Sequence, residues 1–286
     1  MSTESLRPDP VLQVHSLFRG AAEVAKRLRR VAFGIDVVVA AVAAYLVFAE
    51  NDALEAWHPL VAFLAVALAR ALRVRSRESD RFAEVCRRES ARAYACGGTI
   101  SPARLSSLRS DAPWRSLREA QKLPASTLEA YYEPTCPVGE PRLREIYANS
   151  AFHTWHLTRF WFWCLAAGFV LLTIISAVAV YWVANTDGEL TGRTEIIEAL
   201  FSFVLALFWL ELAEALYSAF GSYRSARTTC QRLLSRPLPV GDVLRGLVRD
   251  YDFERTGSPA VPTFLYRVDR QRLEGEWAEC RHEFGC

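Results

Sequence analysis

The sequence predicts an all-α membrane protein with four transmembrane helices, arranged as two hairpins, and a mainly helical cytoplasmic domain. Four apolar stretches are close to the roughly 20 residues that a helix needs to cross about 30 Å of hydrocarbon, namely residues 31–49, 57–74, 157–183 and 196–220. Basic residues cluster before the first stretch and after the second, whereas the short connections at 50–56 and 184–195 are mainly acidic. Because basic flanks stay on the cytoplasmic side, both termini are expected inside a bacterial inner (plasma) membrane.

This topology divides the chain into five segments. Residues 1–30 form an amphipathic cytoplasmic helix, which either lies on the membrane or runs straight into the first span. A first transmembrane hairpin at 31–74, a cytoplasmic insert at 75–156 and a second transmembrane hairpin at 157–220 follow. The C-terminal cytoplasmic segment at 221–286 is expected to pack with the insert, forming one small domain beneath the membrane.

Glycine, proline and capping signals divide the cytoplasmic segments into shorter helices. Gly97 begins a glycine pair, which predicts the end of a helix. Ser101 followed by Pro102 is typical of an N-cap and a proline-led helix. Prolines predict a further break at 236–239, and residues 263–268 are expected to form a short strand.

Composition and motifs argue against an enzyme, a cofactor and a metal site. The net charge of +2 gives no strong field for a DNA or RNA polymer. No phosphate-binding glycine loop, dinucleotide fingerprint, zinc-protease motif or nucleophile elbow occurs. Cys280, His282 and Cys286 lack a fourth zinc ligand at the usual spacing, and His153 and His156 suit headgroup contacts better than metal ligation. The seven cysteines are scattered and none is expected outside the cytoplasm or the membrane, so no disulfide framework is expected.

Four charged residues lie at least four residues from the ends of the predicted spans, where charge is costly: Asp36, Arg70, Glu211 and Glu214. Folding the first hairpin about Ala53 places Asp36 opposite Arg70, because each is 17 residues from that centre. One interpretation is structural, with an Asp36–Arg70 ion pair and glutamates that hydrogen-bond or reach the inner interface. The other is functional: the four residues line an aqueous path between spans or subunits, where three acids against one base would favour cations.

Basic and aromatic residues of the insert are candidate ligand contacts. Guanidinium groups suit phosphates, and aromatic rings can stack on bases. The candidates are Arg87, Arg88, Arg92, Trp114, Arg115, Arg118, Tyr131 and Tyr132. The alternative is that the arginines form a solvated helix face.

The layout resembles a bacterial family, the SMODS-associating four-transmembrane effectors of CBASS anti-phage systems. The shared features are an amphipathic N-terminal helix with Ala25 and Lys26 near its end, two hairpins, the insert and a cytoplasmic tail. Pro113 and Trp114 match a proline-tryptophan pair of the family's insert. The resemblance implies that a neighbouring nucleotidyltransferase makes a cyclic oligonucleotide on infection. It further implies that the cytoplasmic domain senses this signal and that the effector then permeabilises the inner membrane.

Two functional hypotheses follow from these observations. The first is a membrane effector of anti-phage defence that oligomerises and permeabilises the membrane on sensing its signal. Its expected partners are the lipid bilayer, further copies of the chain and a cyclic oligonucleotide. The second is a non-conducting multi-pass anchor or scaffold whose cytoplasmic domain binds a protein partner. The gene next door separates the two, because a nucleotidyltransferase there favours the effector.

Overall fold

Four long helices and four short ones make up the described part of the computed structural model, which covers residues 9–48, 52–122, 132, 134–184, 192–258 and 261–282. The long helices are α1 (Pro10–Phe48), α2 (Asp52–Cys96), α6 (Glu140–Ala184) and α7 (Gly192–Leu234). The short helices are α3 (Pro102–Asp111), α4 (Trp114–Lys122), α8 (Gly241–Thr256) and α9 (Thr263–Arg281). The described residues contain no strand, so the predicted all-α class is confirmed for them.

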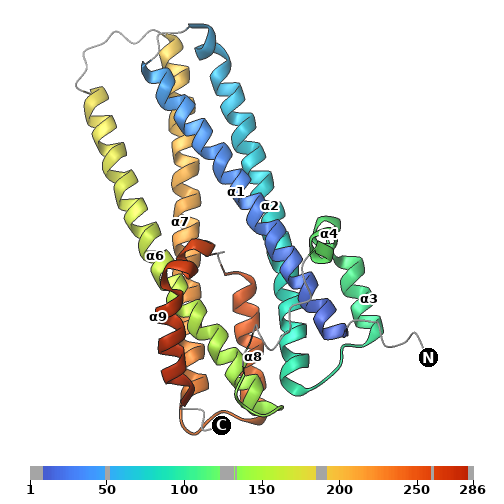
Figure 1. Ribbon diagram of the computed structural model, residues 1–286. Helices are drawn as coiled ribbons and strands as arrows, with labels where there is room; N and C mark the ends of the chain where they lie inside the picture. The colour runs from blue at the N-terminus through green and yellow to red at the C-terminus, as the bar shows by residue number, and fades with distance from the viewer. Residues whose placement is uncertain are drawn as a thin grey trace.

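The long helices form two antiparallel hairpins, α1–α2 and α6–α7, whose turn ends lie at the same end of the molecule (Figure 1). The short helices gather at the other end, where α1 also begins. There α3 and α4 lie against α1, while α8 contacts α2, α6 and α7. The helices α1, α2, α6 and α7 all continue without a break through the segment boundaries predicted from the sequence. The N-terminal amphipathic helix therefore runs straight on towards residues 31–48.

A seam of small side chains joins α1 to α2. On α2, Ala62, Ala69, Ser76 and Ala83 recur every seven residues and are all buried. Small residues let two helices approach closely, and a seven-residue repeat keeps the seam directed at its partner. The hydroxyl of Ser76 donates a hydrogen bond of 3.1 Å to the carbonyl oxygen of Ala25 on α1.

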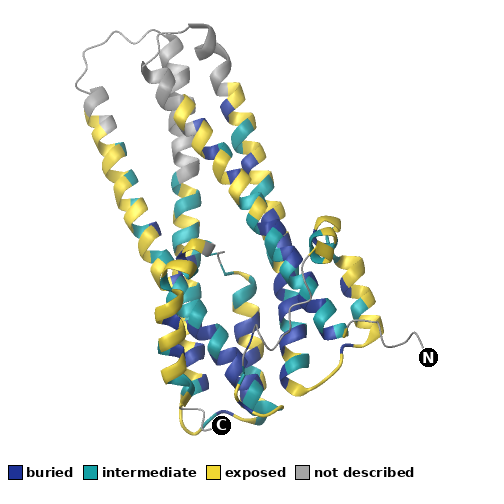
Figure 2. Cartoon of the chain, viewed as in Figure 1, coloured by how far each residue is buried: buried dark blue, intermediate teal, exposed yellow. Residues whose placement is uncertain are grey.

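Towards the hairpin ends, the described parts of the long helices are largely exposed (Figure 2), and many of their exposed side chains are large and apolar. They include Val37, Val38, Leu60, Phe63, Leu64, Leu171, Ile174, Ile175, Val178 and Leu210. On α6, Leu165 is the one buried side chain among residues 159–178. A continuous apolar surface of this kind is unfavourable in water. One stretch of the described residues, Glu140–Val178, is long and apolar enough to cross a membrane, which is compatible with membrane association.

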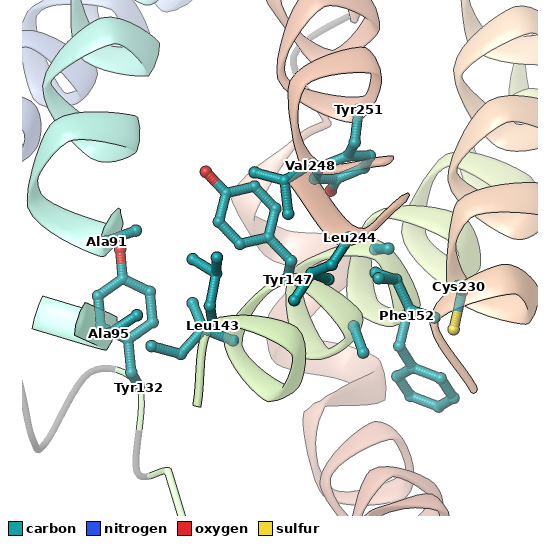
Figure 3. Packing of buried hydrophobic residues seen from close by; sticks show 14 of the residues in the cluster. Ala91, Ala95, Tyr132, Leu143, Tyr147, Phe152, Cys230, Leu244, Val248 and Tyr251 are labelled. Carbon is teal, nitrogen blue, oxygen red and sulfur yellow. The ribbon is translucent and has the colours of Figure 1, made fainter. Parts of the chain in front are cut away.

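The opposite end contains a buried core to which both hairpins contribute. Figure 3 shows Tyr147 of α6 beside Leu244 and Val248 of α8, while Tyr132 lies beside Ala91 and Ala95 of α2. The cluster also includes residues of α1, α3, α7 and α9 and the connecting residues Ile100 and Cys136. This core makes one packed body from the insert, the C-terminal segment and the start of α1.

Several local predictions are confirmed and one is wrong. The helix α2 ends at Cys96, and Gly97 follows with a φ of +63° that favours glycine. The backbone N–H of Arg104 donates to the hydroxyl of Ser101 at 3.2 Å, as expected of an N-cap. Residues 263–268, expected to form a strand, begin α9 instead. Buried residues at helical spacing, Leu265 and Leu273 among them, outweigh the local β propensity.

The cysteine expectation also needs correction. Cys86, Cys96, Cys164 and Cys230 are free, but Cys136 is disulfide-bonded. Burial raises the pKa of the thiols of Cys86 and Cys230 to about 12, so neither is a thiolate at neutral pH.

Candidate functional site

Two of the four charged residues predicted inside the spans, Asp36 and Glu211, meet at Arg73 of α2. One guanidinium nitrogen of Arg73 binds the carboxylate of Asp36 on α1, and another donates to Glu211 Oε2 on α7 at 2.6 Å. The Asp36 side chain is 8% exposed and that of Arg73 is 27% exposed. This Arg73 cluster, comprising Asp36, Arg73 and Glu211, therefore ties the first hairpin to the second.

The predicted partner of Asp36 was wrong. Arg70 is exposed and Arg73 takes the role instead. Arg70 and Arg73 are about one helical turn apart, so depth along the hairpin does not decide which of them pairs with Asp36. The face of α2 on which each arginine lies does decide it. Arg70 is turned by about 100° from the buried seam residue Ala69, whereas Arg73 follows Ala69 by four residues and points close to the seam.

The charge balance also differs from the expected three acids against one base. Glu214 pairs with Arg77 at 3.2 Å, with each side chain 61% exposed. Asp36 and Glu211 share Arg73. Arg73 and Arg77 belong to the basic residues at the cytoplasmic end of the second predicted span, and their long side chains reach back to the acids. In this conformation all three acids are paired within one chain, which favours the structural interpretation of the cluster.

A second ionic network lies in the buried core and includes three predicted ligand contacts. Arg87, whose side chain is 2% exposed, donates two hydrogen bonds of 2.9 Å and 2.6 Å to Glu84 Oε1. It also contacts Asp252 of α8 at 3.2 Å, and Asp252 accepts from Arg92 at 2.7 Å and from the Tyr147 hydroxyl at 2.9 Å. Arg87 is thus enclosed by protein and is not available to a ligand, which corrects that prediction.

Electrostatics in this network follow from burial and pairing. Burial alone would raise the pKa of Glu84, but the guanidinium groups of Arg87 and Arg255 outweigh it and hold the pKa below its usual range. Burial raises the pKa of Asp252 despite the neighbouring Arg87. Burial likewise raises the pKa of the Tyr147 phenol, so Tyr147 stays a hydrogen-bond donor.

The neighbouring arginines also serve to join helices. Arg88 donates to the Thr256 hydroxyl at 2.9 Å, and Arg255 contacts Glu84 at 3.2 Å. Arg92 is half-exposed but is paired with Asp252. The predicted group Arg87, Arg88 and Arg92 therefore fastens α2 to α8. Sequence reasoning missed Asp252 because its partners are about 160 residues away and no local spacing signals the contact.

The remaining ligand candidates separate into an exposed group and a buried one. Trp114 is 65% exposed, Arg115 lies 5.3 Å from the centre of its ring, and Arg118 borders the same groove between α1 and α4. Tyr132 is buried and stacks on Tyr94 with ring centres 5.9 Å apart, so it cannot stack on a base. Tyr131 lies outside the described residues.

The described residues hold no group of three or more His, Cys, Asp or Glu side chains that could bind a metal ion. Fold and site define an all-helical protein with an apolar helix long enough to cross a membrane and an ion-pair cluster between two hairpins. No protein-family model, curated protein or solved structure matches the chain.

Proposed function

We propose that this chain is a four-span inner-membrane effector of anti-phage defence. It oligomerises and permeabilises the membrane when its cytoplasmic domain senses a cyclic oligonucleotide. The exposed apolar side chains on all four long helices support four spans, because water disfavours such a surface and lipid does not. The basic residues that follow the apolar part of α2, from Arg73 onward, support a cytoplasmic position for the packed domain. The proposal that the signal is a cyclic oligonucleotide rests on the family resemblance.

The observation that carries the proposal is the Arg73 cluster. It lies where the apolar part of α2 ends, and it joins α1, α2 and α7 through one guanidinium group. Below it, α2 and α7 run on unbroken into the domain that would sense the signal. A ligand that binds more tightly when the hairpins are apart shifts the population towards that state. Separation leaves Asp36 and Glu211 without their common partner, and water around them would begin a conducting path.

In the open state, Asp36, Glu211 and Glu214 are the proposed lining. Three carboxylates in one path favour cations. Arg70 is exposed on another face of α2, where a neighbouring copy of the chain can approach it in an oligomer.

The second candidate, a non-conducting anchor or scaffold, is favoured by the closed pairing of these charges. Every acid of the cluster has an arginine partner in the same chain. An ion-paired junction of this kind can hold two hairpins together without ever opening. A protein partner of the cytoplasmic domain would then replace the nucleotide signal.

Membrane depolarisation in cells tests the proposal, with a nucleotidyltransferase product supplied as the signal. Wild type is expected to depolarise only with the signal. Arg73→Gln, which frees Asp36 and Glu211, is expected to depolarise without it. Arg73→Lys keeps the positive charge and should again depolarise the membrane only when the signal is supplied. Arg77→Gln removes an equal charge from an exposed pair and should resemble wild type.

The two candidates differ in outcome. Wild type and Arg73→Gln that both leave the membrane potential unchanged, while assembled in the membrane, would favour the scaffold. Signal-dependent depolarisation that survives in Glu211→Gln/Glu214→Gln with unaltered ion selectivity would keep a pore and move its lining elsewhere. Glu274→Gln/Glu279→Gln, at two exposed positions of α9, serves as the charge-matched control.

A further inference from the structure

A basic groove of about 240 Å³ lies between α1 and α4. Arg27 contributes from α1, and Arg115, Arg118 and Lys122 contribute from α4, against the single acid Glu119. Glu119 binds Arg27 at 2.9 Å and Lys122 at 2.8 Å. Glu119 therefore partly balances the charges of Arg27 and Lys122, and it leaves those of Arg115 and Arg118 unbalanced.

Arg115 and Arg118 have no carboxylate partner within the described ranges of the chain. Arg115 instead lies over the ring of Trp114, with 5.3 Å between the guanidinium carbon and the ring centre. A guanidinium group held in place by stacking keeps its N–H donors free for an anion. The guanidinium groups of Arg115 and Arg118, three residues apart on one helix, fit the oxygens of a phosphate.

The groove lies along the part of α1 that leads towards its apolar stretch. The middle of α4 packs on α1 at Gly20, where an added Cβ would come within 2.5 Å of the Ser116 carbonyl oxygen. The groove is lined by Val24 and Leu28, four and eight residues further along α1 towards the apolar stretch. At about 1.5 Å per residue, Leu28 lies about 5 Å from Val31, where the predicted span begins. In the four-span arrangement, that depth is the headgroup layer of the inner leaflet.

Trp114 supports this position. Its side chain is 65% exposed at the groove, although a large aromatic ring is usually covered by protein in water. Tryptophan is enriched where membrane headgroups meet the hydrocarbon, because its ring is apolar and its N–H is polar.

We infer that the groove between α1 and α4 binds the phosphate of an anionic lipid headgroup in the inner leaflet. The inference rests on the proposed four-span topology, which places the groove at the membrane surface. The lipid would hold α4 at that surface and bridge it to α1. The same phosphate chemistry could come from a soluble nucleotide, and the experiment separates the two sources.

The test is lipid retention by the purified full chain, measured by native mass spectrometry after exchange into mixed micelles containing phosphatidylglycerol or phosphatidylcholine. Each basic residue near an anionic surface contributes roughly a factor of five in affinity. Arg115→Gln/Arg118→Gln should thus weaken retention of phosphatidylglycerol about 30-fold. Arg245→Gln/Arg249→Gln removes two exposed charges from α8 and should leave retention unchanged.

Equal retention of phosphatidylglycerol by wild type and the α4 variant would overturn the lipid site, as would an equal loss in the α8 variant. Competition by a soluble cyclic dinucleotide at the α4 arginines, with no preference for phosphatidylglycerol, would also overturn it and assign the groove to a nucleotide. Extraction of membranes at alkaline pH distinguishes a failure of the lipid-site proposal from a failure of the four-span topology. A wild-type protein released from membranes by alkali contradicts the four spans, whereas one that stays embedded without lipid preference contradicts the groove alone.

Discussion

Replacing Asp252 by asparagine should destabilise the domain far more than the same change elsewhere on α8. The Asp252 side chain is 2% exposed and accepts hydrogen bonds from Arg87, Arg92 and Tyr147. Asp252→Asn keeps the shape but removes the charge that two arginines face. Removing one partner of a buried ion pair costs about 3–5 kcal/mol. Because Arg87 keeps its contacts with Glu84, we expect the lower end of that range.

Thermal unfolding of the detergent-purified full chain, followed by circular dichroism, measures the effect. For a domain of this size, a loss of about 3 kcal/mol lowers the Tm by roughly 6–12 °C. The control is Asp242→Asn, also on α8, whose side chain is 98% exposed and 3.4 Å from Arg245. Its Tm should stay within about 2 °C of wild type. Equal shifts in the two variants, or no shift for Asp252→Asn, would refute the view that this network holds α8 to α2.

Three further predictions concern topology, packing and pH. A membrane-impermeant thiol reagent applied to intact cells should spare the exposed Cys96 and modify Asp187→Cys; labelling of Cys96 would contradict a cytoplasmic insert. Gly20→Ala should destabilise the fold by about 1–3 kcal/mol in chemical denaturation, because its Cβ meets α4, whereas Gly34→Ala, with nothing within 4 Å, should not. Burial and Arg19 lower the pKa of His15 from 6.5 to about 4. The neutral ring therefore contributes fully to the stability of the fold above pH 6.5, and this contribution is lost as the pH falls from 6.5 towards 4. His15→Gln should flatten the fall in Tm over that interval, and an unchanged slope would exclude His15 as its source.

Local signals were sufficient to predict helix ends. Gly97 has a positive φ that few other residues adopt, and Ser101 caps the helix that begins at the next residue. Both effects act within a few residues of chain. The lengths of the apolar stretches likewise predicted where the long helices lie, because such a stretch can be recognised from its composition alone.

Contacts between distant segments could not be predicted in the same way. The depth of Asp36 was estimated from residue counting, but choosing Arg73 over Arg70 required knowledge of which face of α2 the small-residue seam directs at α1. Arg87 was predicted to contact a ligand or to lie on a solvated helix face, because its partner Asp252, 165 residues away, gives no local signal. Tyr132 looked available for stacking until the packing of Tyr94 against it was known.

The position of Arg73 along α2 has a mechanical consequence. The helix has 45 residues, from Asp52 to Cys96, and is therefore about 68 Å long. Arg73 stands near its midpoint, so the ion pairs act as a pivot with arms of roughly 30–35 Å on either side. A tilt of about 5° about that pivot would displace each end by about 3 Å, in opposite directions. A small push on the end of α2 in the packed domain thus becomes an equal and opposite movement at its hairpin end, with no change in the helix itself.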